Sequence, residues 1–239
     1  MEKTQKRSKC KMMLAIALLF FGKNYASAQT WSGTLNPGST YRLYTQTVNG
    51  NENGFRVESY TDPNFDGKTY ESVGGVFVTE GGTSAIQFNT TKPVLVSGRI
   101  AIENGHLQVG FGDEATYDHP TLKRANGNET LAIFRVYSRD TNENGCKLSI
   151  IGNENGNIVI DGGCEGITID SSDMRDIQFS HVGGTEAQQA LIVTMGGSLS
   201  LDKVTMKNNW NNAPQGGAIY VTYADLENKK KNVVNMTIV

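Results

Sequence analysis

Short apolar triplets recur through the second half of the chain, and they constrain its fold more than any other feature. Each triplet points two apolar side chains one way and one side chain the other, the alternation of a strand. The triplets form four pairs: 148–150 with 158–160, 167–169 with 177–179, 191–193 with 204–206, and 219–221 with 236–238. First triplets step by 19, 24 and 28 residues, second triplets by 19, 27 and 32. Constant strands with lengthening loops indicate stacked repeats, which can bury an apolar face only together.

Turn residues separate the apolar clusters along the whole chain. The sequence contains 27 glycines and only 5 prolines, and Asn-Gly recurs at 49, 53, 104, 126, 144 and 155. Glycine and asparagine supply the positive φ angles of tight turns, and helical periodicity is nearly absent. The chain is therefore predicted to be all-β. A hairpin-rich sandwich uses the same dipeptides, so the repeats and not the turns indicate the topology.

Two stretches carry a family resemblance. Residues 206–209 (Met-Lys-Asn-Asn) and 216–219 (Gly-Gly-Ala-Ile) resemble the F-x-x-N and G-G-A-I repeat of polymorphic outer-membrane proteins and related adhesin-like β-helices. Residues 148–152 and 158–163 resemble the early coils of pectate-lyase-like proteins. The resemblance implies a right-handed single-stranded parallel β-helix, a solenoid, preceded by an irregular β N-terminal cap region. It covers residues 146–239, although G-G-A-I occurs once and methionine replaces the usual phenylalanine.

The predicted organisation has three parts. Residues 1–28 form a signal peptide, 29–145 form the N-terminal β region with irregular early coils, and 146–239 form the β-helix coils. A separate small β domain is the alternative for 29–145, and the stretch 112–128 is expected to be a long loop. The last predicted strand runs up to Val239 without a polar capping segment, so we expect an N-terminal fragment of a longer protein; a short natural last coil is the alternative. An uncapped solenoid end exposes strand edges, which predicts self-association there.

The first 28 residues have the three parts of a cleavable secretory signal. A lysine-rich start precedes the apolar run 12–21, and Ala26-Ser27-Ala28 supplies small residues at the cleavage site. Cleavage is predicted between Ala28 and Gln29; an uncleaved anchor is the alternative, although the run is shorter than the ~20 residues of a membrane span. The sequence therefore predicts a secreted protein or one on the outer cell surface of a Gram-negative bacterium. No second long apolar segment follows, so it is not expected to be an integral helical membrane protein.

The charge of the chain limits the classes of partner that it can bind, and its cysteines raise the question of a disulfide. Residues 1–28 hold six of the 22 basic and one of the 24 acidic residues, which leaves 16 basic, 23 acidic and a net charge of −7. This balance argues against nucleic acid, which binds clustered basic residues. Cys146 and Cys164 remain, 18 residues apart. Their pairing in a disulfide is left open, because sequence does not give the Cα spacing that a disulfide needs.

No catalytic, cofactor-binding or metal-binding residues are predicted. Asp161, Asp170, Asp173 and Asp176 are the acids near the strands, but the first two end strands on different faces and the others share one turn. The histidines at 106, 119 and 181 are isolated. Trp210, in an asparagine-rich turn, has two interpretations: a sugar-stacking platform, or packing beneath its own loop, which is favoured.

These features predict a secreted or cell-surface, adhesin-like structural and binding protein without catalytic activity of its own. Its expected partner is a host or environmental glycan or protein. The alternative is a carbohydrate-active β-helix protein, a polysaccharide lyase or glycoside hydrolase, whose active residues lie in further coils.

Overall fold

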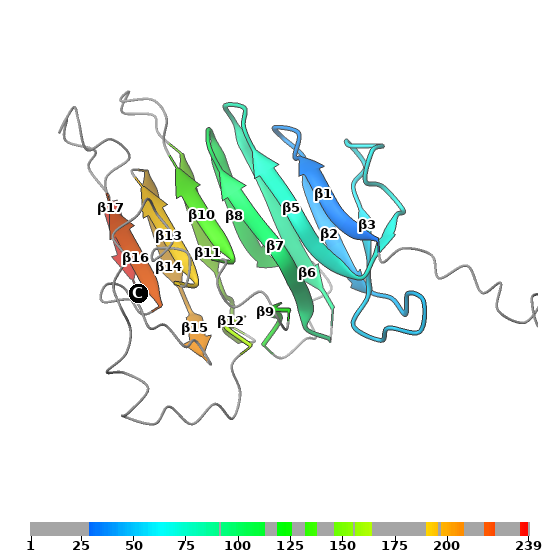
Figure 1. The fold of residues 1–239 in the computed structure, drawn as a ribbon. Helices are drawn as coiled ribbons and strands as arrows, with labels where there is room; N and C mark the ends of the chain where they lie inside the picture. The colour runs from blue at the N-terminus through cyan, green and yellow to red at the C-terminus, as the bar shows by residue number, and fades with distance from the viewer. Residues whose placement is uncertain are drawn as a thin grey trace, which may run out of the picture.

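The computed structural model describes residues 29–90, 92–112, 119–125, 132–137, 146–154, 156–163, 190–195, 197–207, 218–222 and 235–238. Within these ranges the chain is all-β, with 17 strands and no helix. The N-terminal strands β1 to β3 lie at one end of the molecule, and β16 and β17 lie at the other (Figure 1). The predicted signal peptide, with Ala28 at its cleavage site, lies outside the described residues.

The strands form two sheets. Sheet A has nine strands: β1 (Thr30–Thr34), β5 (Ser72–Val78), β7 (Val94–Ile102), β9 (Thr121–Arg124), β10 (Phe134–Tyr137), β12 (Ile158–Asp161), β13 (Ile192–Met195), β15 (Val204–Lys207) and β16 (Ile219–Thr222). Sheet B has eight: β2 (Thr40–Thr45), β3 (Phe55–Glu58), β4 (Thr69–Tyr70), β6 (Thr83–Asn89), β8 (His106–Phe111), β11 (Lys147–Ile151), β14 (Ser198–Asp202) and β17 (Asn235–Ile238). Every strand pair is parallel except β2–β3 and β3–β4.

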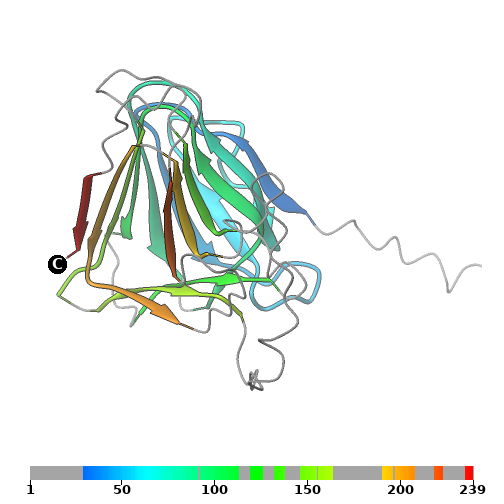
Figure 2. The same ribbon diagram turned by 60° about the vertical axis from the view of Figure 1, so that its left-hand side comes forward.

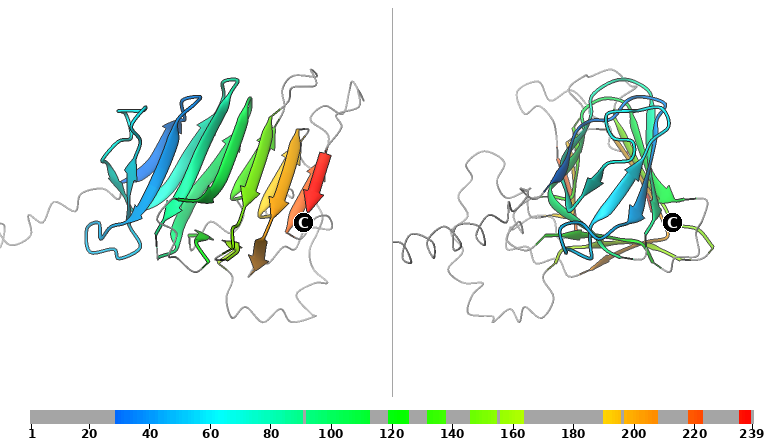
Figure 3. Two further views of the ribbon diagram at one scale, coloured as in Figure 1. Left: turned by 180° about the vertical axis from the view of Figure 1, so that it is seen from behind. Right: turned by 90° about the vertical axis from the view of Figure 1, so that its right-hand side faces the viewer.

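Sheet A curls sharply at β7, which belongs to two rows of strands. The first half of β7 pairs with β9 and the second half with β10. The molecule therefore has three rows. The first contains β1, β5, β7, β10, β13 and β16, the second is sheet B, and the third contains β9, β12 and β15 with the start of β7. Seen end-on, the rows enclose a roughly triangular section, with the third row across its base (Figure 2 and the right panel of Figure 3).

The core fills the space between the rows. It includes Ile100 and Ile102 of β7, Leu148 and Ile150 of β11, and Ile158 and Ile160 of β12, all of which are buried. Each buried aliphatic side chain contributes about 1.5–3 kcal/mol. Parallel register brings like residues together, as with Leu107, Leu148 and Leu199, so apolar columns run along the stack.

The register confirms one predicted neighbour pair and corrects others. β13 lies beside β16, as the predicted stacking of 191–193 and 219–221 requires, but Ile192 and not Leu191 lies opposite Ile219, so the register differs from the triplet alignment by one residue. The prediction that 177–179 separates 158–160 from 204–206 is wrong, because Ile158 pairs directly with Val204. The predicted stacking of 236–238 on 204–206 is also wrong: β17 pairs with β14, a strand of alternating serine and leucine that the triplet search misses. Loops of very different length explain why sequence spacing does not report spatial neighbours. The predicted strands at 167–169 and 177–179 lie outside the described residues.

The predicted long loop at 112–128 contains β9, so that prediction is wrong in part. Leu122 is buried and pairs with Val94, while its neighbours Thr121 and Lys123 are partly exposed. One apolar residue in a basic strand is a weak sequence signal.

The junction between β14 and β15 is very short. Lys203 alone separates the two strands, and its φ of 50° turns the chain from one row to the next.

Both sheets continue past the predicted boundary at 145 and 146, since β10 pairs with β13 and β8 with β11. The N-terminal end differs from the rest of the stack. There the antiparallel strands β3 and β4 extend sheet B, and a group of buried aromatic residues lies beneath them. The described structure therefore has one continuous core with a distinct aromatic end.

We predict that Gly98→Ala destabilises the fold through the bend of β7. A β carbon on Gly98 would lie 1.4 Å from the carbonyl oxygen of Gly74, so the two backbones could not keep their present approach. The free energy of unfolding in urea should fall by about 3 kcal/mol. Gly81→Ala is the matched control: nothing lies within 4 Å of its β-carbon position. Equal stability of the two variants would contradict this account of the bend.

Candidate ligand-binding surface

The first strand of sheet B has one buried and one outward face. In β2, Tyr41 and Leu43 are buried, while Arg42 and Tyr44 point outward. The alternation Tyr-Arg-Leu-Tyr therefore places a guanidinium and a phenol on the surface of a strand that its other side chains anchor in the core. Strands hold side chains more rigidly than loops do, which suits a binding surface.

The neighbouring strand β3 adds further residues to this surface. β3 runs antiparallel to β2, with Arg42 opposite Glu58 and Tyr44 opposite Arg56. Tyr60 follows two residues after β3, and 81% of it is exposed. Six residues make up this group, which we call the tyrosine–arginine cluster: Arg42, Tyr44, Arg56, Glu58, Tyr60 and Gln87.

Contacts within the cluster link each arginine to a ring. The Arg42 guanidinium carbon lies 5.8 Å from the centre of the Tyr60 ring, and Arg42 Nε donates to Gln87 Oε1 at 3.2 Å. The Arg56 guanidinium carbon lies 5.1 Å from the Tyr44 ring, and Arg56 forms an ion pair with Glu58. Cation–π contacts of this kind contribute about 0.5–1 kcal/mol at exposed sites. They restrict the rotamers of the exposed side chains before any ligand arrives.

Buried aromatic residues support the cluster from below. The ring of Trp31 lies within 5.8–6.4 Å, centre to centre, of the rings of Tyr41, Phe55, Phe65 and Tyr70. Tilted and edge-to-face pairs at such distances add about 0.5–1.5 kcal/mol beyond their buried area. The surface cluster therefore sits on the most aromatic part of the core.

A buried carboxylate fixes this aromatic base. Asp62 is fully buried, and its Oδ2 accepts a hydrogen bond of 2.7 Å from the Tyr41 hydroxyl. Its Oδ1 accepts from the backbone of Asn64 at 3.1 Å. Burial first, and then the hydrogen bond to Asp62, raise the pKa of Tyr41 above its ordinary value, so the phenol stays protonated as a donor. Burial and the charge of Asp62 also raise the pKa of Tyr70.

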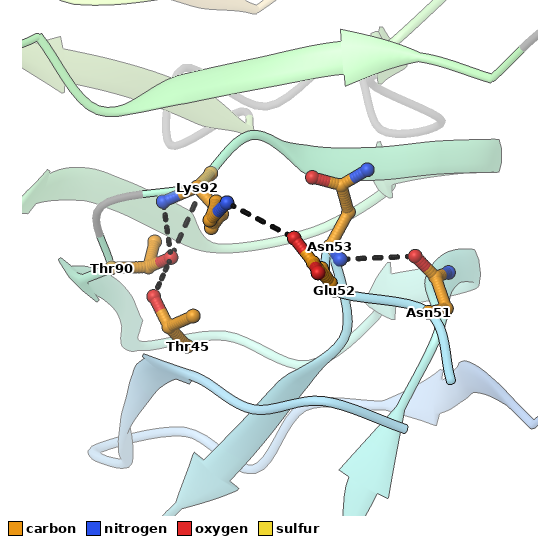
Figure 4. A network of polar contacts seen from close by, with 6 residues as sticks. All are labelled: Thr45, Asn51, Glu52, Asn53, Thr90 and Lys92. Atoms are coloured by element: carbon orange, nitrogen blue, oxygen red, sulfur yellow. Dashed lines mark hydrogen bonds and ion pairs between the residues drawn. The ribbon is translucent and has the colours of Figure 1, made fainter. Parts of the chain in front are cut away.

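Two loops meet beside the cluster, where polar contacts hold them together (Figure 4). The hydroxyls of Thr45 and Thr90 lie 2.8 Å apart, and the Thr90 hydroxyl accepts from the backbone of Lys92 at 3.2 Å. The Lys92 ammonium lies 3.5 Å from the Glu52 carboxylate. The ends of β2 and β6 are thereby tied to each other at the edge of the surface.

Asn89 lies next to Tyr44 in the sheet register and is only 3% exposed. Its side-chain nitrogen and oxygen have no hydrogen-bond partner within the described ranges. A β carbon on Gly112 would come within 2.1 Å of the Asn89 oxygen, so glycine at 112 makes room for the amide. Asn89 also begins an N-x-S/T triplet, and its burial makes it a poor acceptor for an attached glycan.

Most residues singled out in the sequence do not join this surface. Cys146 is buried, while Cys164 lies outside the described residues, so their disulfide stays a prediction. Trp210 also lies outside them, and its sugar-stacking role is untested. Gln29, the predicted first residue after cleavage, is the first described residue and is exposed.

The histidines and Asp161 have structural contacts. His106 Nε2 lies 2.9 Å from the Ser149 hydroxyl, and burial, with a smaller effect of Lys147, lowers the pKa of His106. His119 Nδ1 accepts from the Asn157 backbone at 3.2 Å. Asp161 lies in β12, in the third row, where it accepts from the Gly163 backbone at 2.8 Å and lies 3.6 Å from the Lys207 ammonium. Asp170, Asp173, Asp176 and His181 lie outside the described residues.

Sequence reasoning missed the tyrosine–arginine cluster. Its signal was available, because the segments 41–44 and 55–58 alternate apolar residues with arginine, tyrosine or glutamate. The sequence could not show two features: the antiparallel pairing that sets Tyr44 beside Arg56, and the approach of Tyr60 to Arg42.

Comparisons with family models, curated proteins and solved structures found no match to this chain. In the part of the chain that the structure describes, no group of three or more histidine, cysteine, aspartate or glutamate residues is placed to hold a metal ion. The same part contains no helix with the length and apolar character of a membrane span.

We predict that Tyr41→Phe lowers the free energy of unfolding by about 1–3 kcal/mol, because buried Asp62 loses its hydroxyl donor. Tyr60→Phe should change stability by less than about 0.5 kcal/mol, since the Tyr60 side chain is exposed. Urea unfolding followed by circular dichroism measures both. A Tyr41→Phe protein as stable as the parent would show that the hydrogen bond does not support the aromatic base.

Proposed function

We propose that this chain is an exported, adhesin-like binding protein whose right-handed single-stranded parallel β-helix presents a glycan-binding surface. The strand order supports the β-helix. From β10 to β15 the chain visits the first, second and third rows twice in that order, and each strand lies parallel to the one a circuit earlier. Crossovers between parallel strands are almost always right-handed, which supports the handedness.

The observation that carries the binding role is the exposed ring of Tyr60, two residues after β3, which lies beside Arg42 of strand β2. Tyrosine and arginine are the residues most enriched in binding hot spots, because each offers a large flat surface together with polar groups. Sugars expose flat C–H faces and many hydroxyls. A tyrosine ring can pack against the first, while arginine and the Gln87 amide can bond to the second. The net charge of the cluster is only +1, from two arginines and one glutamate. The cluster therefore does not require a charged ligand to balance it.

The export part of the proposal rests on the signal-like residues 1–28. Their positive start, apolar run and Ala26-Ser27-Ala28 site support secretion or display at the outer surface of a Gram-negative cell. Self-association through the strands at the C-terminal end of the stack remains part of the proposal.

The test is glycan binding by matched variants of the full chain. A printed array of neutral oligosaccharides identifies the best ligand, and titration calorimetry then measures its affinity. Tyr60→Ala should weaken binding about tenfold or more, as expected for loss of a hot-spot aromatic, and Arg42→Gln should weaken it as well. Gln108→Ala, a change at an exposed position of β8 on the same sheet, should leave the affinity unchanged.

Two outcomes would count against the proposal. Equal affinity of the Tyr60→Ala and parent proteins would show that the tyrosine–arginine cluster is not part of the binding site. Continuous release of new reducing ends from an oligosaccharide would instead favour the carbohydrate-active alternative, because a binding protein has no turnover.

A further inference from the structure

The loop between β3 and β4 carries two aspartates on one turn of backbone. Residues 62–67 have the sequence Asp-Pro-Asn-Phe-Asp-Gly. The backbone nitrogen of Asp66 donates to the carbonyl oxygen of Asp62 at 3.1 Å, and Gly67, with a φ of 68°, follows the turn. Side chains four residues apart on such a turn lie on the same face. The turn therefore places the carboxylates of Asp62 and Asp66 on one face of the loop.

Asp62 is buried without an opposite charge. It is 0% exposed, and both of its side-chain contacts are with neutral donors: Oδ2 accepts from the Tyr41 hydroxyl, and Oδ1 accepts from the backbone of Asn64. No basic side chain pairs with Asp62 in the described part of the chain. Buried charges in proteins are normally paired with an opposite charge or bound to a metal ion. Each oxygen of Asp62 accepts one hydrogen bond and has a further lone pair for a ligand.

Ser59 supplies an oxygen without a partner between the two acids. Its backbone nitrogen donates to Asp66 Oδ1 at 2.9 Å, and its carbonyl oxygen accepts from the Asp62 nitrogen at 3.4 Å. The Ser59 residue is 1% exposed, and among the described residues its hydroxyl has no hydrogen-bond partner. Ser59 continues the inward alternation of Val57, so its hydroxyl points to the buried side, where Asp62 meets Tyr41. A buried hydroxyl of this kind costs free energy unless a ligand satisfies it.

The solvent side of the loop offers two further oxygens. Asn64 and Asp66 are exposed. Within the described ranges, the Asn64 side chain and Asp66 Oδ2 form no hydrogen bond or ion pair. The loop thus combines two carboxylates, an amide and a hydroxyl. Calcium takes about six to eight oxygen ligands of these kinds, with water among them, whereas zinc prefers nitrogen and sulfur.

We propose that this loop is a calcium-binding site, in which the carboxylates of Asp62 and Asp66, the side-chain oxygen of Asn64 and the hydroxyl of Ser59 bind the ion. Calcium would supply the positive charge that buried Asp62 lacks and would satisfy the Ser59 hydroxyl. The site needs only two acidic residues, because amide and hydroxyl oxygens complete the protein ligands. It is independent of the proposed glycan-binding role, and each can fail without the other.

The sequence of the loop agrees with this proposal. Asp-x-Asn-x-Asp-Gly is the first half of the EF-hand calcium loop, in which alternate residues supply ligands and the glycine makes the sharp turn. The second half is absent, since Val73 stands where that motif has its closing glutamate. Lys68, whose ammonium donates to the Asn64 carbonyl oxygen, also reduces the net charge of residues 59–68 to −1. We therefore expect weak binding, with a Kd of about 0.1–1 mM, as in extracellular calcium modules.

Titration calorimetry of the full chain with calcium chloride, after treatment with a chelator, measures the site. Magnesium chloride should bind at least tenfold more weakly, because magnesium gives up its water reluctantly. Asp66→Asn removes a charge but keeps an oxygen for the Ser59 nitrogen, and Asn64→Ala removes the amide. Each should weaken calcium binding at least tenfold. Glu80→Gln is the matched control, since it removes an exposed negative charge from the turn between β5 and β6 and should leave the affinity unchanged.

Thermal melts with and without calcium separate a binding loop from a merely structural one. Calcium should raise the melting temperature of the parent and of Glu80→Gln, and it should not raise that of Asp66→Asn or Asn64→Ala. Without calcium, Asn64→Ala should melt at the same temperature as the parent, because its side chain is exposed. A structural role alone would lower the melting temperature of the variants equally in both conditions.

Several results would overturn the proposal. One is the absence of both binding heat and a melting shift at calcium concentrations well above the expected Kd. Undiminished binding by the double variant Asn64→Ala/Asp66→Asn would place the ion elsewhere in the chain. An equal loss of affinity in Glu80→Gln, or equally tight binding of magnesium, would show general charge attraction instead of a calcium site.

Discussion

Parallel, in-register pairing of short strands is the constraint on which the rest of this structure depends. No single strand of four to nine residues buries enough apolar surface to be stable alone. Hydrogen bonding to the strands before and after it sets like residues into columns, as with Leu107, Leu148 and Leu199. Each further strand added to a sheet extends the core. Loops of different lengths can connect the strands, because the register is held within the sheets.

The N-terminal end of the sheets combines a structural role with the proposed binding role. Antiparallel strands β3 and β4 extend sheet B there, and the Trp31 aromatic group with Asp62 fills the space beneath. The same strands carry Arg42, Tyr44 and Arg56 on their other face. Inward and outward side chains alternate along these strands. The inward residues that stabilise this end therefore also fix the orientation of the proposed glycan-binding surface.

The all-β class and several strands could be predicted from the sequence, whereas the proposed binding surface could not. Strict apolar triplets at 158–160 and 219–221 predicted strands correctly, and 191–193 was correctly placed beside 219–221, although one residue out of register. β9 and β14 were missed, because a basic strand with one inward leucine and a serine–leucine alternation resemble loops. Surface clusters escape such reasoning for another reason. Tyr60 lies beside Arg42, and Tyr44 beside Arg56, only because β2 and β3 pair antiparallel.

The parallel register itself is tested most directly by a disulfide cross-link. Ile151 of β11 and Asp202 of β14 are outward register partners, 51 residues apart in sequence. Adjacent strands lie about 4.7–4.9 Å apart, within the Cα range of disulfides. The account predicts that Ile151→Cys/Asp202→Cys oxidises readily to that bond, mapped by mass spectrometry, without loss of the cooperative melt, whereas Ile151→Cys/Ser200→Cys, two residues out of register, does not. Cross-linking of the second pair in preference to the first, or of neither, would contradict the account.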